Sequence, residues 1–314
     1  MSKLYVSSSP HLRSDTSTKS IMRDVLIALF PACIASAVYF GWKPLMLIAV
    51  CIMVSVVTEY VCRFVMKREQ TVGDLSAAVT GMLLALNLPP NTNPLIAAFG
   101  CVAAIVVVKQ MFGGIGMNFV NPALAARIIL LTSFPQQMTS WDDTGFMEKA
   151  IDGVSSATPL AAPKGTYSYM DLLLGNHGGS LGETCAVALL LGGLYLVIRK
   201  VIAPTIPVAF IGTAGIMSLL LGRNPVVDVL SGGILLGAIF MATDYTTSPI
   251  TFWGKVIYGV GCGVLTLLIR EFSYIPEGVS FAIILMNILT PLIENMTTPC
   301  HFGKEKKRKG EAMV

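Results

Sequence analysis

The chain has 314 residues, of which 54% are hydrophobic and only 13% are charged, and its formal net charge at pH 7 is +4. A typical soluble domain carries about 25% charged residues, so this composition excludes an ordinary soluble protein. It indicates an integral membrane protein.

The first 23 residues are polar and carry scattered bases. They lack the continuous apolar core and the small-residue cleavage site of a signal peptide. We therefore expect residues 1–23 to be a cytoplasmic N-terminal segment that is not removed.

Residues 24–134 contain five apolar runs of helical length, which we interpret as transmembrane helices. A polar, proline-rich stretch, NLPPNTNP, follows the third run and predicts a break in the helical backbone. The third, fourth and fifth runs are short for a full crossing of the bilayer. The predicted spans are 24–42, 45–66, 75–88, 94–109 and 120–134.

The next 47 residues, 135–181, form a mildly acidic segment that we expect to be an extracytoplasmic loop. A loop of this length between membrane helices is usually functional. Its centre is DGVSSAT, residues 152–158, in which small side chains permit tight bending and Thr158 presents a hydroxyl. The apolar pair Pro159–Leu160 could then lie back on the membrane domain. Taken alone, the pattern is more typical of a polar turn than of a site.

Residues 182–294 contain five further apolar runs, and a basic tail, residues 295–314, follows them. A second polar stretch, TDYTTSP, follows the eighth run, in the position that NLPPNTNP occupies in the first half. The predicted spans are 182–199, 205–221, 227–243, 252–269 and 278–294.

The two groups of five runs are an internal repeat. LSAAVTGMLLALNLPPNTNPL, residues 75–95, aligns without gaps with LSGGILLGAIFMATDYTTSPI, residues 230–250, and GMNF at 116–119 resembles GVSF at 278–281. Because five is odd, the second group enters the membrane from the opposite side. The sequence thus predicts an all-α protein of about ten transmembrane helices in two inverted five-helix repeats. The two polar breaks are either walls of a cavity between the repeats or turns at the membrane surface.

Lysine and arginine set the predicted orientation. With the N-terminus inside, the cytoplasmic segments collect sixteen bases and the outer segments only five. We therefore expect both termini to be cytoplasmic. The basic tail is explained by topology and anionic lipid, and no nucleic-acid-binding module is present.

Cysteine and histidine do not point to a metal site. The seven cysteines include no C-x-x-C pair and mostly lie in apolar runs, where cysteine acts as a small hydrophobe, and the three histidines are scattered. We expect no metal ligands among Cys33, Cys51, Cys62, Cys101, Cys185, Cys262, Cys300, His11, His177 and His301.

From about residue 8 to residue 294 the chain resembles a known family, the one that contains the D subunit of the Rnf complex and the B subunit of the sodium-translocating NADH:quinone reductase. The segments that carry the resemblance are SPHLRSDTSTKSIMRDVLIALFPA, GMLLALNLPPNTNPL, GGIGMNFVNPALAARIILLTSFPQQMTSW, FMATDYTTSPIT and IPEGVSFAIILMNILTPLIE.

In that family, an Asp-Gly-x-(Ser/Thr)-Gly-Ala-Thr motif is where a flavin transferase joins FMN to the threonine by a phosphoester. The resemblance implies that Thr158 is the attachment residue. Ser156 replaces the usual glycine and removes some backbone freedom. The other matching positions of the motif are Asp152, Gly153, Ser155 and Ala157.

The resemblance implies a membrane electron-transfer subunit of a ferredoxin:NAD⁺ oxidoreductase, a redox-driven translocase of Na⁺ or H⁺ in the bacterial cytoplasmic membrane. It implies a second, non-covalent flavin, such as riboflavin, in the membrane domain. The expected partners are membrane lipid, the flavin transferase and the A, B, C, E and G subunits of the complex. We expect no complete active site and no catalytic residue in this chain, since it holds no Rossmann fingerprint, P-loop or cysteine cluster.

Five polar residues lie in or at the ends of apolar spans, where charge is costly and usually paired. Arg127 and Glu59 are the most deeply placed, and each suits a structural ion pair, an ion path or a clamp for a flavin phosphate. The five are Glu59, Arg127, Asp244, Asn287 and Glu294.

A stand-alone channel or transporter for a small polar solute is the alternative. Inverted five-helix repeats with broken helices also suit proteins that resemble urea channels, and fold alone does not decide function. The long outer loop with its threonine motif disfavours this alternative, because a simple pore has no need of it.

Overall fold

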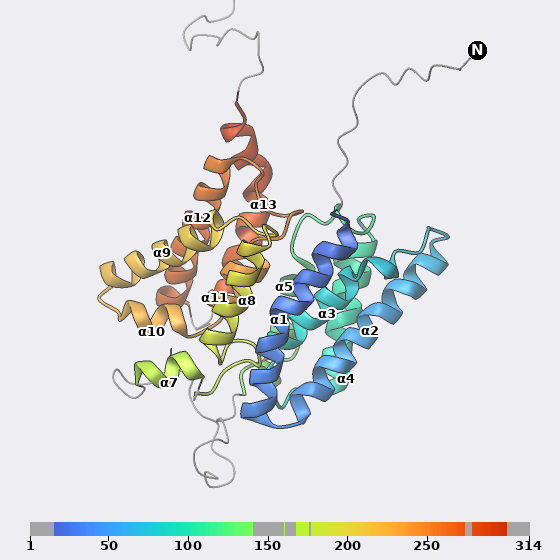
Figure 1. Cartoon of the computed structure of the whole chain (residues 1–314), viewed down its shortest axis with the longest axis horizontal. Helices are drawn as coiled ribbons and strands as arrows, with labels where there is room; N and C mark the ends of the chain where they lie inside the picture. The colour runs from blue at the N-terminus through green and yellow to red at the C-terminus, as the bar shows by residue number, and fades with distance from the viewer. Residues whose placement is uncertain (1–15, 141–159, 161–167, 176, 274–277, 300–314) are drawn as a thin grey trace, which may run out of the picture.

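The computed structural model describes residues 16–140, 160, 168–175, 177–273 and 278–299, and all regular structure within these ranges is helical (Figure 1). The first half contains five principal helices, and two of its segments are short. The element bounds are α1 Thr18–Phe40, α2 Lys43–Val65, η1 Val72–Asp74, α3 Ser76–Leu86, α4 Pro94–Ala103 with its π-helical continuation η2 Ala104–Gln110, α5 Pro122–Ser133 and α6 Pro135–Met138.

The second half repeats this order after the short helix α7. The bounds are α7 Tyr169–Leu174, α8 Ala186–Ile198, α9 Thr205–Leu220, α10 Pro225–Leu230, α11 Ile234–Leu236 with its π-helical continuation η3 Gly237–Met241, α12 Phe252–Phe272 and α13 Val279–Thr297.

All ten predicted spans overlap helices, although the helix of span 182–199 begins only at Ala186 and the eighth span, 227–243, is not continuous. It consists of α10 and the α11–η3 segment, which are separated by Ser231, Gly232 and Gly233. The φ angles of the two glycines are +69° and +72°, a left-handed backbone that a right-handed helix cannot include. The apolar run therefore predicted the position of this span and missed the bend inside it.

The outer surface of the helices is apolar, as expected for a protein that contacts lipid. Four described helices, α1, α2, α12 and α13, are long and apolar enough to cross a membrane, and five shorter helices are also apolar. Large hydrophobic side chains such as Phe64, Trp253 and Phe272 are 69%, 67% and 80% exposed. A soluble monomer rarely exposes so much apolar surface, whereas hydrocarbon solvates it well. The all-α integral membrane class predicted from the sequence is confirmed.

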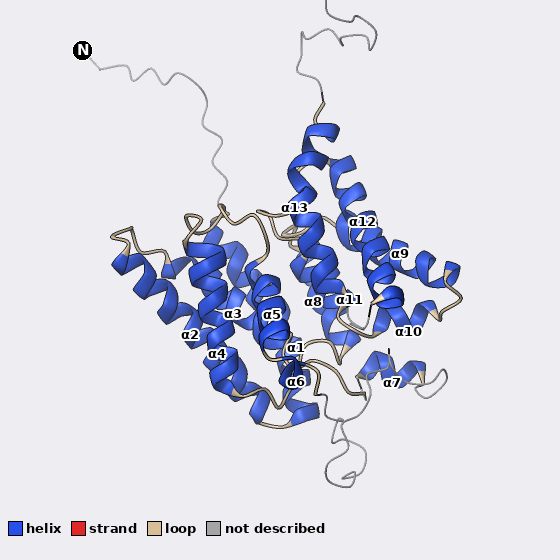
Figure 2. Ribbon diagram, turned by 180° about the vertical axis from the view of Figure 1, so that it is seen from behind, coloured by secondary structure: helices blue, strands red, loops and turns tan. Residues whose placement is uncertain are grey.

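The helices form two bundles, one of α1 to α5 and one of α8 to α13 (Figure 2). The bundles meet where α1 packs along α8 and where α5 packs on α13. Each contact joins the same helix of the two halves, the first with the first and the fifth with the fifth. Elements related by a twofold axis meet in this way, so the packing agrees with the inverted repeat.

The ends of the helices define two faces. α1 begins and α13 ends on one face, which we call the terminal face, whereas α6 and α7 lie on the opposite face, which we call the loop face (Figures 1 and 2). At the loop face the hydroxyl of Tyr39, at the end of α1, donates to the carbonyl oxygen of Leu174 in α7. At the terminal face Arg199, just after α8, pairs with Asp24 of α1 across 3.2 Å.

The contact between α1 and α8 depends on a glycine. A Cβ atom added to Gly192 of α8 would lie 2.2 Å from the carbonyl oxygen of Ala28 in α1, so only glycine permits this approach of the two backbones. Gly212 of α9 is the matched control, because an added Cβ atom there has no neighbour within 4 Å.

We predict opposite effects of alanine at these two glycines. Gly212→Ala should leave stability unchanged or raise it slightly, since alanine favours a helix by about 0.5–1 kcal/mol. Gly192→Ala should lower stability by about 1–3 kcal/mol despite the same gain, because the backbones must separate. Thermal unfolding in detergent measures the difference, and equal melting temperatures would refute the close contact.

Candidate functional site

The first part of the break after α3 is buried inside the protein by a second irregular segment. Residues 177–184 are not helical and are buried, as are residues 87–90 of the break. The amide of Leu181 donates to the carbonyl oxygen of Leu88 at 3.1 Å, and that of Gly182 donates to Leu86 at 2.7 Å. Irregular backbone at membrane depth needs such partners. The first part of this break is therefore an internal packing element, whereas its second part, with Asn91 and Asn93, is exposed at the surface.

A buried ion pair lies at this place, between the two halves. Arg127 of α5 and Glu183 of the irregular segment approach to 3.3 Å, and their side chains are 4% and 3% exposed. Arg127 Nη1 also donates to Asn87 Oδ1 at 2.8 Å and to Ser280 Oγ at 3.4 Å. We call these four residues the central cluster. Its members come from both halves, and Arg127 thus takes part in a buried ion pair, one of the three roles that the sequence left open for it.

Glu59 also forms a structural ion pair, in the first half. Its carboxylate lies 2.9 Å from Lys109 Nζ and accepts a hydrogen bond from Gln110 Nε2 at 2.8 Å. The side chains of Glu59 and Lys109 are 0% and 3% exposed. Lys109 Nζ also donates to Ser76 Oγ at 2.6 Å, at the start of α3. This contact ties the end of η2 to the first residue of the broken helix.

The break after η3 borders a cavity of about 370 Å³, which we call the break cavity. Thr243 and Asp244 of the break line it, together with Asn118 and Asn121 from the segment before α5. Asp244 accepts hydrogen bonds from the hydroxyls of Thr246 and Thr247, which are 2.9 Å and 3.3 Å away. The second break is therefore a cavity wall, in contrast to the first. Much of the remaining wall is apolar and comes from α1 and α3, including Ile21, Met22, Val25, Val79 and Leu83.

The two remaining polar residues singled out from the sequence have local partners. The side-chain amide of Asn287 on α13 lies 2.5 Å from the hydroxyl of Tyr258 on α12. Glu294 Oε1 accepts a hydrogen bond of 2.9 Å from the amide of Ile250, just before α12. Both contacts join α13 to α12 or to the segment before it. They are structural contacts within the second bundle.

The threonine motif, residues 152–158, lies outside the described residues, so the positions of Asp152, Gly153, Ser155, Ala157 and Thr158 stay predictions. Leu160 is described and is half-buried. A Cβ atom added to Gly232 would lie 2.4 Å from Leu160 Cδ1. Leu160 therefore packs on the bend between α10 and α11.

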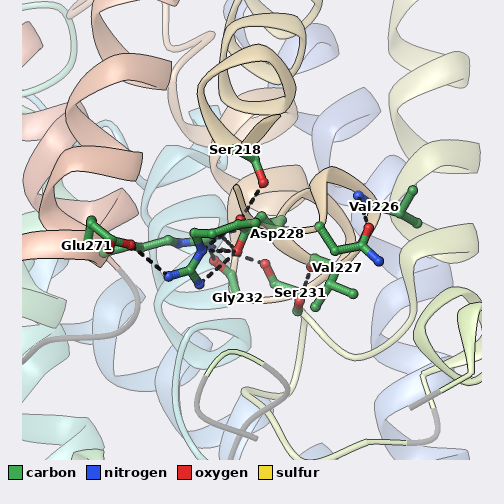
Figure 3. A network of polar contacts seen from close by, with 10 residues as sticks. Ser218, Val226, Val227, Asp228, Ser231, Gly232 and Glu271 are labelled. Carbon is green, nitrogen blue, oxygen red and sulfur yellow. Dashed lines mark hydrogen bonds and ion pairs between the residues drawn. The ribbon is translucent and has the colours of Figure 1, made fainter. Parts of the chain in front are cut away.

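Buried charges hold this bend (Figure 3). Arg270 of α12 donates to the carbonyl oxygens of Asp228, Ser231 and Gly232 at 2.7, 3.2 and 2.6 Å. The Asp228 carboxylate accepts from Ser218 Oγ at 2.6 Å and from Arg223 Nε at 3.0 Å. The hydrogen bond with Asp228 raises the pKa of the Arg223 guanidinium above its usual value. We call Asp228, Arg270 and Arg223 the bend network.

Sequence reasoning missed Glu183, Asp228, Arg270 and the two glycines of the bend. Two signals were present. Glu183 is a charge inside the predicted span 182–199, and LSGG at 230–233 places two glycines where the first repeat has LSAA. Among the described residues, no group of three or more His, Cys, Asp and Glu side chains could hold a metal ion.

We predict that the central ion pair is strongly coupled. Arg127→Gln leaves the Glu183 carboxylate buried without its partner, which typically costs about 3–5 kcal/mol. Arg127→Gln combined with Glu183→Gln should restore much of this loss. Glu271→Gln, which removes the 39% exposed carboxylate of the Arg223–Glu271 pair, should cost less than about 1 kcal/mol. Unfolding in detergent of the wild type, of these variants and of the single variant Glu183→Gln measures these effects, and additive effects of Arg127→Gln and Glu183→Gln would contradict the coupling.

Comparison with known proteins assigns the family. Residues 5–303 match the NQR2, RnfD, RnfE family. The chain is 48% identical over 313 residues to the D subunit of the Na⁺-translocating ferredoxin:NAD⁺ oxidoreductase complex of Acetobacterium woodii, with 98% of this chain and 97% of the relative covered. It is 41% identical to the D subunit of the proton-translocating ferredoxin:NAD⁺ oxidoreductase complex of Clostridium ljungdahlii, with 96% of each chain covered. The chain therefore belongs to the NQR2, RnfD, RnfE family.

Proposed function

We propose that this chain is the membrane electron-transfer subunit of an ion-translocating ferredoxin:NAD⁺ oxidoreductase complex and carries covalent FMN on Thr158. One observation carries the proposal. Two relatives named as the D subunits of such complexes match 98% and 96% of this chain at 48% and 41% identity. Since the similarity covers both halves and the loop between them, it concerns the whole subunit and not only its fold.

Thr158 is the proposed attachment residue, and the motif chemistry suits the transfer. The threonine oxygen would attack the flavin-bearing phosphorus of a flavin dinucleotide and form a phosphoester, the P–O–P bond of the dinucleotide would break, the nucleotide monophosphate would leave, and the threonine proton would be lost to water. Such an attack requires a segment of small residues that can enter the site of the transferase. Asp152, Gly153, Ser155 and Ala157 supply that segment. When bound, the isoalloxazine ring accepts and releases electrons, while the protein sets its position.

The fit of a flavin at this place is supported by residues that the structure describes. α6 and α7, which come before and after the attachment segment in the sequence, lie on the loop face (Figure 2), and Leu160, two residues after Thr158, packs on Gly232. The glycine leaves a space that a Cβ atom would fill. Leu160 occupies this space, and its contact with Gly232 fixes the chain just after Thr158 against the membrane domain.

The break cavity is the proposed site of a second, non-covalent flavin such as riboflavin. Its volume of about 370 Å³ and its largely apolar wall suit a flat aromatic ring. Asn118, Asn121, Thr243 and Asp244 offer hydrogen-bonding groups for a polar ring edge. These residues would hold the ring.

We propose that the terminal face is cytoplasmic and that the loop face lies outside the bacterial cytoplasmic membrane. Lys67, Arg68, Lys109, Arg199 and Lys200 lie at helix ends on the terminal face, as the positive-inside rule requires. The proposed partners are the A, B, C, E and G subunits of the complex, which we expect to supply ferredoxin and nicotinamide chemistry. The transported ion is Na⁺ or H⁺, since the two relatives are named for different ions.

We predict that Thr158 alone carries the attached flavin. After expression with the flavin transferase, the denatured protein should fluoresce in a gel, and the Thr158 peptide should carry the mass of one FMN less one water. Thr158→Ala should abolish both signals, whereas Thr166→Ala, a matched change in the same segment, should retain them. An unmodified Thr158 peptide from the native organism would contradict the proposal. Solute uptake by the flavin-free protein would support a pore instead.

A further inference from the structure

The bend at Gly232 and Gly233 presents its two glycines to two different partners. A Cβ atom on Gly232 would lie 2.4 Å from Leu160 Cδ1 and 2.9 Å from Arg270 Nη2. A Cβ atom on Gly233 would lie 2.5 Å from Glu183 Oε1. The space beside Gly232 is therefore filled by Leu160 of the loop, and the space beside Gly233 by Glu183 of the central cluster.

Arg270 makes the Gly232 side of the bend rigid. Its side chain is 1% exposed, and its guanidinium donates to the carbonyl oxygens of Asp228, Ser231 and Gly232. These oxygens lie at the end of α10 and in the bend, where helix geometry leaves carbonyl groups without internal partners. Asp228 balances the charge from 4.0 Å. Leu160 therefore rests on a surface whose backbone is fixed by a buried cation.

The sequence ties this contact to the proposed attachment residue. Thr158 precedes Leu160 by two residues. Two residues of extended chain span at most about 7 Å, so an anchored Leu160 limits the positions that the Thr158 oxygen can occupy. A cofactor that exchanges electrons with neighbouring subunits needs such a limit, because the protein must hold its reactive ring in place.

We propose that Gly232 and Arg270 form a seat for Leu160, and that this seat positions the flavin carried on Thr158. Gly232 and Leu160 are then positioning residues, which act on the flavin through the chain and not by touching it. The flavin part of this inference rests on the proposed function. The seat itself rests only on described residues.

The test compares three variants of the full chain in detergent. Gly232→Ala places a methyl group against Leu160, and Leu160→Ala removes the anchor while leaving the bend intact. Gly222→Ala is the matched control, because the φ angle of Gly222 is +68° and an added Cβ atom there has no neighbour within 4 Å. It imposes the same backbone strain without a clash. Thermal unfolding and size-exclusion chromatography of each variant establish that it is folded.

Hydrogen exchange of the peptide that contains Leu160 is the first readout. We expect about tenfold faster exchange in Leu160→Ala and Gly232→Ala, which corresponds to about 1.4 kcal/mol, and no change in Gly222→Ala. If Gly232→Ala fails to fold, Leu160→Ala still decides the question. Unchanged exchange in Leu160→Ala, or equal changes in both glycine variants, would overturn the seat.

Fluorescence anisotropy of the attached flavin is the second readout. We expect lower anisotropy in Leu160→Ala and Gly232→Ala at unchanged flavin content, which mass spectrometry of the Thr158 peptide measures. If exchange is faster in Leu160→Ala and Gly232→Ala but the wild-type Thr158 peptide carries no flavin, the proposed function is refuted and the seat is retained. Attached flavin with equal anisotropy in the wild type and in Leu160→Ala would refute the positioning role and keep the proposed function.

Discussion

The structure depends on one requirement, that backbone N–H and C=O groups at membrane depth find partners within the protein. Both halves break a helix, and each break exposes such groups. Residues 181 and 182 supply amides to the break after α3, Arg270 supplies a guanidinium to the carbonyls of the Gly232 bend, and Asn121 Nδ2 donates to the carbonyl oxygen of Met241 at 3.2 Å. Backbone groups that the breaks leave without helical partners need other hydrogen-bond partners. This need explains the positions of the irregular segment, the buried cations and the break cavity.

The two halves solve this problem in parallel ways. In the first half Lys109, at the end of the fourth helix, reaches Ser76 at the start of the broken α3 and pairs with Glu59. In the second half Arg270, near the end of the fourth helix α12, reaches Gly232 before the broken α11 and lies near Asp228. Inversion of the repeat places the first pair towards the terminal face and the second towards the loop face. A buried cation at the end of each fourth helix is thus a feature of the repeat.

The order of helices and their approximate bounds could be predicted, because lipid demands long apolar runs and the chain shows them plainly. The bend at Gly232 could not be predicted from the apolar pattern, because Ser-Gly-Gly scarcely changes the hydropathy of span 227–243. The burial of residues 177–184 could not either, since a run rich in glycine and serine is also typical of an exposed loop. The partner of Arg127 is 56 residues away in the sequence. Only packing of the two halves brings Glu183 to it, so the sequence pointed to Arg127 as a buried charge, with an ion pair as one of three roles, and could not name Glu183 as its partner.

The two glycines of the bend are neighbours in the chain, and adjacent Cα atoms are about 3.8 Å apart. One peptide unit therefore separates the contact with Leu160 from the contact with Glu183. A rotation of one bundle against the other that displaced Glu183 would press on the same peptide unit that supports Leu160. The packing of Leu160 and the packing between the halves therefore share one short piece of backbone.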